Sequence, residues 1–325
     1  MERLDAFLAR ASAAYYGHGA GIGADFTTAP EMTQAFGECL GLWSALAWEA
    51  MGRPARVVWA ECGPGRGTLI QDALRAVEQM VPAFASAAEI HLVETSPVLR
   101  AMQKGRMGAR VSAWHDRIED LPGGPLVLLG NEFLDALPIR QFIRREGVWR
   151  ERWVSEGQFV ECPTEEDWGG APEGSVKERC EPGLSIAAHL GARLAREGGV
   201  ALFLDYGPGE SGLGDSLQAM KAGKPADPLA DPGAVDVTAH VDFAAFAAAA
   251  AKAGATAQGP VPMGLFLQRL GLVSRSAMLA RVEPFHARNL LGAAQRLVAP
   301  EGMGRLFKSL ALTHPGLPPL EGFRE

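Results

Sequence analysis

The sequence predicts an α/β fold in which helices connect the strands of a central parallel sheet. From Arg56 onward, short apolar strands alternate with helices, a pattern typical of parallel sheets with right-handed crossovers. A length of 325 residues, with 47% hydrophobic and 21% charged residues, fits a folded chain and excludes a disordered one. A glycine-rich turn at Gly63–Gly67 follows the first strand. Together these observations predict one elaborated domain, or two, around a ligand site at strand ends.

Residues 1–52 are expected to form a helical N-terminal segment with a lid. A short helix is followed by the glycine-rich stretch Gly17–Gly23. Apolar residues at helical spacing then predict a helix over Glu31–Met51. Thr27 or Thr28 is the expected N-cap, because a threonine hydroxyl accepts the free N–H groups of a first turn.

Residues 53–207 contain the predicted core. Five parallel strands are expected, over Val57–Ala60, Glu89–Val93, Arg110–Trp114, Pro125–Leu129 and Val200–Tyr206. Alternating residues broken at Gly147 and Gly157 predict an antiparallel meander over 141–162, inserted into this core. An acidic loop, Cys162–Pro182, and a helix, Ile186–Glu197, are expected to lead to the fifth strand.

The C-terminal part is expected to supply the substrate side and then to return to the sheet. Residues 208–235 are rich in Gly, Pro and Asp, and an Ala-rich helix follows that either begins at Thr238 or is capped by Asp242 and ends at Gly254. The expected units are therefore the N-terminal segment (1–52), the core (53–207), a helical and loop insertion (208–300) and a segment with the last strand, Arg305–Leu312 (301–325).

The overall charge and the cysteine pattern exclude several classes of site. A net charge of −7 and a pI of about 5.6 argue against a nucleic-acid-binding protein. The four cysteines and seven histidines form no metal-ligand spacing, so no metal site is predicted. No apolar run approaches the roughly 20 residues that cross a bilayer, and the N-terminus has no signal or transit character. We therefore expect no membrane insertion and a cytoplasmic location.

The strongest local signal is Glu61-Cys-Gly63-Pro-Gly65-Arg-Gly67, between a strand and a helix. Closely spaced glycines there let backbone N–H groups approach a ligand at a helix N-terminus. The spacing is GxGxG, whereas the dinucleotide fingerprint GxGxxG would need a glycine at Thr68. The pattern favours S-adenosylmethionine (SAM) over NAD(P), with Glu61 serving the cationic methionine part.

Acidic residues also follow the next two strands. Glu94 ends the second strand, where a carboxylate can accept hydrogen bonds from both ribose hydroxyls. Asp116 follows the third strand and can meet the adenine amino group. Each acid alone is weak evidence, since helix N-termini attract acidic residues in any case. Together with Glu61 they predict one cofactor site along three successive strand ends.

Seven motifs occur in order from about Tyr15 to the C-terminus: Gly23-Ala-Asp-Phe-Thr-Thr-Ala-Pro-Glu31, Phe36-Gly-Glu38, Glu61–Leu69, Asn131–Pro138, Gly199–Gly207, Asp236–Phe243 and Met303–Lys308. Together they resemble the MidA-like SAM-dependent methyltransferases. The resemblance implies a class I Rossmann-like methyltransferase fold. The family's mitochondrial members are assembly factors of respiratory complex I that methylate an arginine of its 49-kDa-type core subunit. A protein arginine is therefore the implied acceptor.

The resemblance also implies roles for residues beside the methyl donor. Glu132 and Asp135 are the implied catalytic residues, with Glu132 gripping the guanidinium and Asp135 as its partner or the proton acceptor. Asn131 is implied to hold the SAM amino group. The alternative is that the two acids cap the following turn.

Two further groups of residues complete the implied site. The lid residues that reach the cofactor are Asp25, Thr27 and Thr28, and the residues that line the acceptor pocket are Asp205, Tyr206, His240 and Asp242. The alternatives are a structural loop with a helix cap for the first group and a satisfied polar network for the second. The rival functions are a SAM-binding assembly scaffold with little turnover and an NAD(P)-dependent oxidoreductase.

Overall fold

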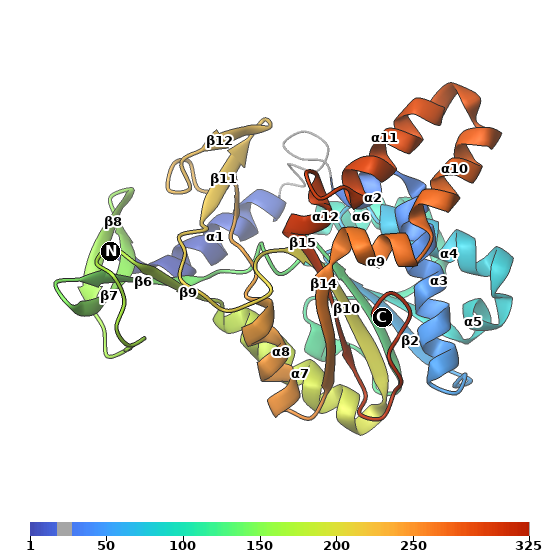
Figure 1. Cartoon of the computed structure of the whole chain (residues 1–325), viewed down its shortest axis with the longest axis horizontal. Coiled ribbons are helices and arrows are strands. Elements are labelled where there is room, and N and C mark those ends of the chain that lie inside the picture. The colour runs from blue at the N-terminus through green and yellow to red at the C-terminus, as the bar shows by residue number, and fades with distance from the viewer. Residues whose placement is uncertain (18–27, 325) are drawn as a thin grey trace.

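The computed structural model describes residues 1–17 and 28–324. Its centre is a seven-stranded sheet in the order β14-β15-β10-β5-β2-β3-β4 (Figure 1). The strands are β2 (Val57–Cys62), β3 (Ala88–Val93), β4 (Val111–His115), β5 (Leu126–Asn131), β10 (Gly199–Tyr206), β14 (Thr256–Pro262) and β15 (Phe307–Thr313). The five predicted core strands are mutually parallel, and β15 pairs antiparallel with both β10 and β14. The predicted α/β Rossmann-like fold is confirmed.

The strand sequences explain why helices cover both faces of this sheet. β2 is buried along its whole length, and its successive side chains enter opposite apolar clusters. Val57 and Trp59 pack with one set of helices: α3 (Gln34–Ala50), α4 (Thr68–Met80), α9 (Met263–Arg269), α10 (Leu272–Val282) and α11 (Ala287–Val298). Val58 and Ala60 pack with α7 (Glu181–Glu197) and α8 (Phe243–Lys252) on the other face.

The strand order creates a ligand-binding crevice beside β2. The chain passes from β2 to β3 and β4 on one side of the sheet, and then returns to β5 on the other side of β2. Ligands in open α/β sheets bind outside the carboxyl ends of the strands at such a switch point. The glycine turn after β2 and the residues after β5 therefore lie next to each other.

Two smaller sheets stand beside the core. An antiparallel sheet of five strands contains the predicted meander and two strands that the sequence pattern did not predict: β1 (Glu2–Arg3), β6 (Arg140–Arg145), β7 (Val148–Ser155), β8 (Gln158–Pro163) and β9 (Val176–Arg179). A three-stranded sheet follows β10: β11 (Gln218–Lys221), β12 (Lys224–Ala226) and β13 (Asp236–Thr238). Helix α1 (Leu4–Gly17) shares an apolar cluster with residues of both sheets (Figure 1).

Several element boundaries differ from the sequence-based expectation. The helix expected over Glu31–Met51 is two helices, α2 (Ala29–Met32) and α3, because Thr33 is extended and caps α3 through its hydroxyl. Helix α8 begins after Asp242, whose carboxylate accepts the N–H of Ala245, so the cap alternative is the correct one. The pattern missed β14 because Gly259-Pro260 interrupts it, and glycine and proline weaken strand signals.

The remaining helices are α5 (Pro82–Ala87), α6 (Pro97–Met107) and α12 (Met303–Leu306), and the 3₁₀ turns are Gly108–Arg110, Ile118–Asp120 and Pro284–His286. Helices α10 and α11 form a hairpin that projects from the body of the molecule (Figure 1). Among the helices in the described part of the chain, none has the length and apolar character that crossing a membrane requires.

Candidate active site

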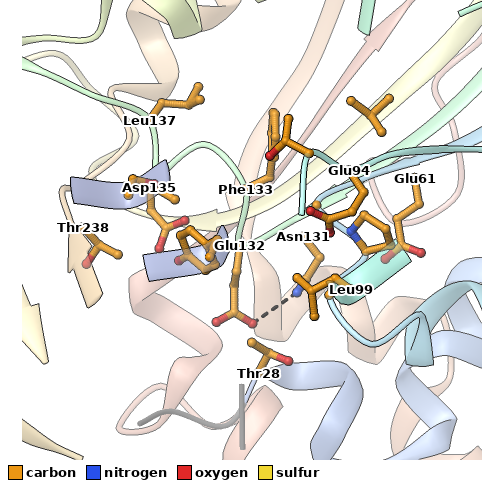
Figure 2. Close-up of a pocket in the computed structure, with 18 of the residues that line it drawn as sticks. Thr28, Glu61, Glu94, Leu99, Asn131, Glu132, Phe133, Asp135, Leu137 and Thr238 are labelled. Carbon is orange, nitrogen blue, oxygen red and sulfur yellow. Dashed lines mark hydrogen bonds between the residues drawn. The ribbon is translucent and has the colours of Figure 1, made fainter. Parts of the chain in front are cut away.

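A cavity of about 670 Å³ opens at the carboxyl ends of β2, β3, β4 and β5. Figure 2 shows Glu61 and Glu94 at one end, Asp135 and Thr238 at the other, and Asn131 and Glu132 between them. The described residues that line this cavity include eight carboxylates: Glu31, Glu61, Glu94, Asp116, Glu119, Glu132, Asp135 and Asp236. Such a lining favours positively charged ligands.

The glycine turn gives the cavity its closest backbone surface. Gly63, Gly65 and Gly67 all have positive φ, at 61°, 52° and 79°, a region that side chains other than glycine rarely adopt. Gly67 is the left-handed N-cap of α4, so the free N–H groups of that helix face the cavity end of β2. The turn therefore has the geometry expected of a ligand-binding loop.

Glu61 is a buried carboxylate at the cavity end of β2. Its side chain accepts the backbone N–H of Ile70, while Oε2 has no hydrogen-bond partner among the described residues. Burial, with a smaller contribution from Glu94, raises the pKa of Glu61 to about 8. A buried acceptor without a partner is costly unless a ligand satisfies it. The ammonium of the SAM methionine part fits this requirement.

Glu94 and Asp116 lie further along the same end of the cavity. Glu94 is buried, and its Oε1 accepts the N–H of Ser96 at 2.8 Å, which fixes the carboxylate at the end of β3. Asp116 is exposed and forms an ion pair with Arg100 at 2.7 Å. Both line the cavity, together with Glu61 and the glycine turn. The residues predicted to bind the ribose and the adenine, Glu94 and Asp116, thus line the same cavity as the glycine turn.

The residues after β5 adopt an unusual backbone conformation. Glu132 has φ of 48°, which is uncommon for a residue with a side chain and is found often at functional sites. Its Oε1 accepts the side-chain N–H of Asn131 (Figure 2) and the backbone N–H of Ala29, both at 3.1 Å. Burial raises the pKa of Glu132. Asn131 keeps its buried Oδ1 without a partner among the described residues.

The carboxylate of Asp205 fixes the loop after β5 by hydrogen bonds to its backbone. Its Oδ2 accepts the backbone N–H groups of Phe133, Leu134 and Asp135 at 3.1, 2.8 and 3.3 Å. Its Oδ1 accepts the N–H of Tyr206 at 2.9 Å. Asp205 is buried and does not line the cavity, so its carboxylate orients the loop.

A second group of acids gathers at the far end of the cavity. Asp135 is buried, and burial, followed by repulsion from Asp205, Glu132 and Asp236, raises its pKa well above the usual value. The Tyr206 hydroxyl donates to Thr238 Oγ1 at 2.5 Å. The only basic residues among the described lining are Arg66, which lies within the glycine turn, and Arg117, which follows Asp116.

The sequence pattern missed two residues at this end. Tyr16 donates its hydroxyl to Asp236 Oδ1 at 2.8 Å, and both residues line the cavity. Tyr16 stands next to the glycine-rich stretch, and Asp236 begins one of the seven motifs. Their proximity to these motifs was the signal in the sequence that could have identified them. Periodicity alone does not distinguish a side chain that reaches a cavity from one that packs in the core.

Two of the predicted acceptor-pocket residues lie elsewhere. His240 and Asp242 line a separate cavity of about 540 Å³, bounded by β9 and the start of α8. Asp242 caps α8 and accepts the Ser211 hydroxyl at 2.6 Å, so a structural role explains it. Thr28 lines the main cavity, whereas the predicted residues Asp25 and Thr27 lie outside the described residues. Among residues 1–17 and 28–324, no cluster of His, Cys, Asp and Glu side chains is arranged to hold a metal ion.

Comparison with known proteins identifies the cofactor class. Residues 39–261 match the family model for S-adenosyl-L-methionine-dependent methyltransferases. A crystal structure from Burkholderia thailandensis with bound S-adenosyl-homocysteine is 27% identical, with a TM-score of 0.83 over 98% of this chain and 89% of that one.

Two curated relatives match this chain over most of its length. The protein arginine methyltransferase NDUFAF7 homolog of Drosophila melanogaster is 34% identical, over 90% of this chain and 75% of the relative. The protein arginine methyltransferase NDUFAF7 of Danio rerio is 33% identical, over 89% and 76%. Both are named as mitochondrial proteins, so the expected cytoplasmic location is wrong. That expectation rested on the composition of this chain's N-terminus, which gave no sign of the mitochondrial location that the names of these relatives carry.

The GxGxG turn, the acids at successive strand ends and these matches lead to the same result. The chain belongs to the MidA-like family of SAM-dependent methyltransferases.

Proposed function

We propose that this protein transfers a methyl group from SAM to the guanidinium of an arginine in another protein. The observation that carries the proposal is a group of three carboxylates: Glu132, half-buried in the middle of the cavity, and Asp135 and Asp236, which are buried. A guanidinium stays charged at neutral pH and offers several N–H donors to such a group. Its charge would offset the mutual repulsion of these acids. The names of the relatives support the same acceptor.

In this proposal the two ends of the cavity have separate tasks. Glu61, Asn131 and the turn of Gly63, Gly65 and Gly67 hold the methionine part of SAM, Glu94 holds the ribose and Asp116 holds the adenine. Bound SAM supplies a methyl group already activated by the sulfonium. What remains for the protein is orientation, because the acceptor nitrogen must be held in line with the bond that breaks.

Glu132 and Asp135 orient and deprotonate the acceptor in this scheme. The Glu132 carboxylate takes the guanidinium in a bidentate grip, and its position is fixed by the N–H groups of Ala29 and Asn131. The acceptor nitrogen gains a methyl group and loses a proton. We assign the proton to Asp135, whose buried carboxylate lines the cavity beside Glu132.

The parts of the chain outside the core fit this division. Ser12, Tyr16 and Thr28 of segment 1–52 and Gln218, Asp236 and Thr238 of segment 208–300 line the cavity at or near the acceptor end. We therefore assign the first segment as a cover and the second as the substrate side. We further propose the 49-kDa-type subunit of complex I as the acceptor protein, on the resemblance to the family.

The proposal is tested by incubating the purified protein with tritiated SAM and the 49-kDa-type subunit. We expect tritium to enter the subunit, and we expect no incorporation when its arginines are replaced by lysine. Binding of SAM without incorporation into any protein would instead favour the assembly scaffold.

A further inference from the structure

The helical region 263–306 has a charge opposite to that of the whole chain. It contains six arginines and two glutamates, in a protein with a net charge of −7. Four of the arginines are exposed: Arg281, Arg288, Arg296 and Arg305. Within the described part of the chain none of these four forms an ion pair, whereas Arg275 is paired with Glu38 at 2.6 Å. Unpaired arginines on an acidic protein indicate a surface for an anionic partner.

Two of these arginines lie on the same side of α11. Arg288 and Arg296 are eight residues apart, which places them about 12 Å apart along the helix axis and about 80° apart around it. Gly292 lies between them, and a side chain placed there would meet nothing within 4 Å. The outer face of α11 is therefore an open strip bounded by two cationic groups.

Apolar side chains continue this strip at the tip of the hairpin. Phe285 is 101% exposed and Val282 is 78% exposed, although both are large and hydrophobic. Met278 and Leu291 are about half exposed on the two helices that meet there. Interface cores are enriched in Phe, Met and Arg, and exposed apolar side chains gathered in one place mark interaction sites.

The base of the same hairpin lies beside the mouth of the cavity. Helix α11 packs against α2, whose Ala29 N–H bonds Glu132. Burial raises the pKa of Glu132, and the positive charge of Arg296 partly opposes this shift. The carbonyl of Leu306 on α12 accepts the N–H of Gly207, next to Tyr206. A partner whose arginine enters the cavity would therefore lie along α11.

We propose that the face formed by Arg281, Phe285, Arg288 and Arg296 docks an acidic segment of the methyl-acceptor protein. This inference rests on the proposed function, since it assigns the acceptor a second feature besides its arginine. The cavity takes the cation, and the hairpin takes the acidic segment and an apolar side chain near it. A bilayer would touch only the tip at Val282 and Phe285, whereas the exposed arginines extend to Arg296 in the last turn of α11 and to Arg305 on α12.

Charge reversal at the hairpin tests the proposal. Arg288→Glu should raise the KM for the full-length acceptor by about fivefold and weaken its dependence on salt. The KM for a short peptide around the methylated arginine and the Kd for SAM should not change. The matched control is Lys252→Glu, which reverses an exposed charge on α8, on the opposite face of the core sheet. Phe285→Ser should likewise raise only the KM for the full-length acceptor.

A second measurement does not depend on turnover. Fluorescein-labelled poly-L-glutamate should bind the wild-type protein and Lys252→Glu equally and bind Arg288→Glu more weakly, as measured by fluorescence anisotropy. If the wild type methylates no protein, the proposed function fails, and this binding experiment still decides whether the face takes acidic chains.

Three outcomes would overturn the docking proposal. The first is an unchanged KM for the full-length acceptor in Arg288→Glu, together with unchanged binding of poly-L-glutamate. The second is binding to phosphatidylglycerol vesicles that Arg288→Glu abolishes while the KM for the acceptor stays the same, which would assign the face to a membrane. The third is a dimer of the wild type that Phe285→Ser dissociates, which would assign it to a second copy.

Discussion

Glu132 occupies a left-handed backbone position, and its carboxylate lies at the centre of the cavity. Glu132→Gln keeps an oxygen that can accept the N–H groups of Ala29 and Asn131, but it removes the negative charge. We expect kcat for methylation to fall about 100-fold or more, with the Kd for SAM unchanged. Steady-state kinetics and calorimetric titration measure the two quantities. Glu119→Gln, the same replacement elsewhere in the cavity lining, should retain activity.

Glu61 predicts a pH dependence of stability and of cofactor binding. Burial raises its pKa from 4.5 to about 8, so the folded protein without cofactor holds a proton that the unfolded chain releases. The contribution of Glu61 to stability is complete below pH 4.5 and is lost as the pH rises to about 8. SAM favours the ionised carboxylate, so its affinity should increase over the upper part of this range.

Glu61→Gln removes the titrating group and is the matching variant. Thermal unfolding without cofactor, measured from pH 5 to 9, should depend less on pH in the variant than in the wild type. The Kd for SAM should be weaker and should lose most of its pH dependence. A wild-type Kd that is constant from pH 6 to 8 would contradict the assignment of Glu61 to the cofactor ammonium.

At the scale of elements, the close contact between α3 and α4 holds the glycine turn in place. A Cβ atom on Gly41 would approach the carbonyl oxygen of Ala73 to 2.6 Å, so only glycine permits this helix spacing. Gly41→Ala should lower the free energy of unfolding by about 1–3 kcal/mol. Gly292→Ala on α11 meets open space and should raise it by about 0.5–1 kcal/mol. Chemical denaturation compares the two variants, and equal effects would contradict the packing argument.

The helices and strands also show which features the sequence could predict and which it could not. The five parallel core strands are apolar runs bounded by turns, so their pattern is unambiguous. β9 and β14 were missed because polar residues and Gly259-Pro260 hide the strand signal. In the site, Glu61 lies near the end of β2, and Glu94 and Glu132 directly follow β3 and β5, so all three were predictable by position. Asp236 and Tyr16 reach the cavity from outside the core strands, and their contact across 220 residues depends on tertiary packing.

At the scale of the whole molecule, the cofactor should stabilise the fold as a unit, because its site combines residues after β2, β3, β4 and β5. At 100 times its Kd, S-adenosyl-homocysteine should add about 2.7 kcal/mol to the free energy of unfolding. A rise in Tm with S-adenosyl-homocysteine and none with NADH is the expected result. A rise with NADH alone would favour the oxidoreductase reading of the glycine turn.

The acidic cavity and the cationic hairpin together form the basis of our proposal that the acceptor is selected by two charges of opposite sign. In the proposed reaction the methyl group arrives on an arginine of a protein. Fragmentation mass spectrometry of the 49-kDa-type subunit after incubation with the wild-type protein and SAM detects this product. We predict a mass increase of one or more methyl groups on an arginine guanidinium, absent with Glu132→Gln. Methylation confined to lysine or carboxylate side chains, or a subunit of unchanged mass, would contradict the account.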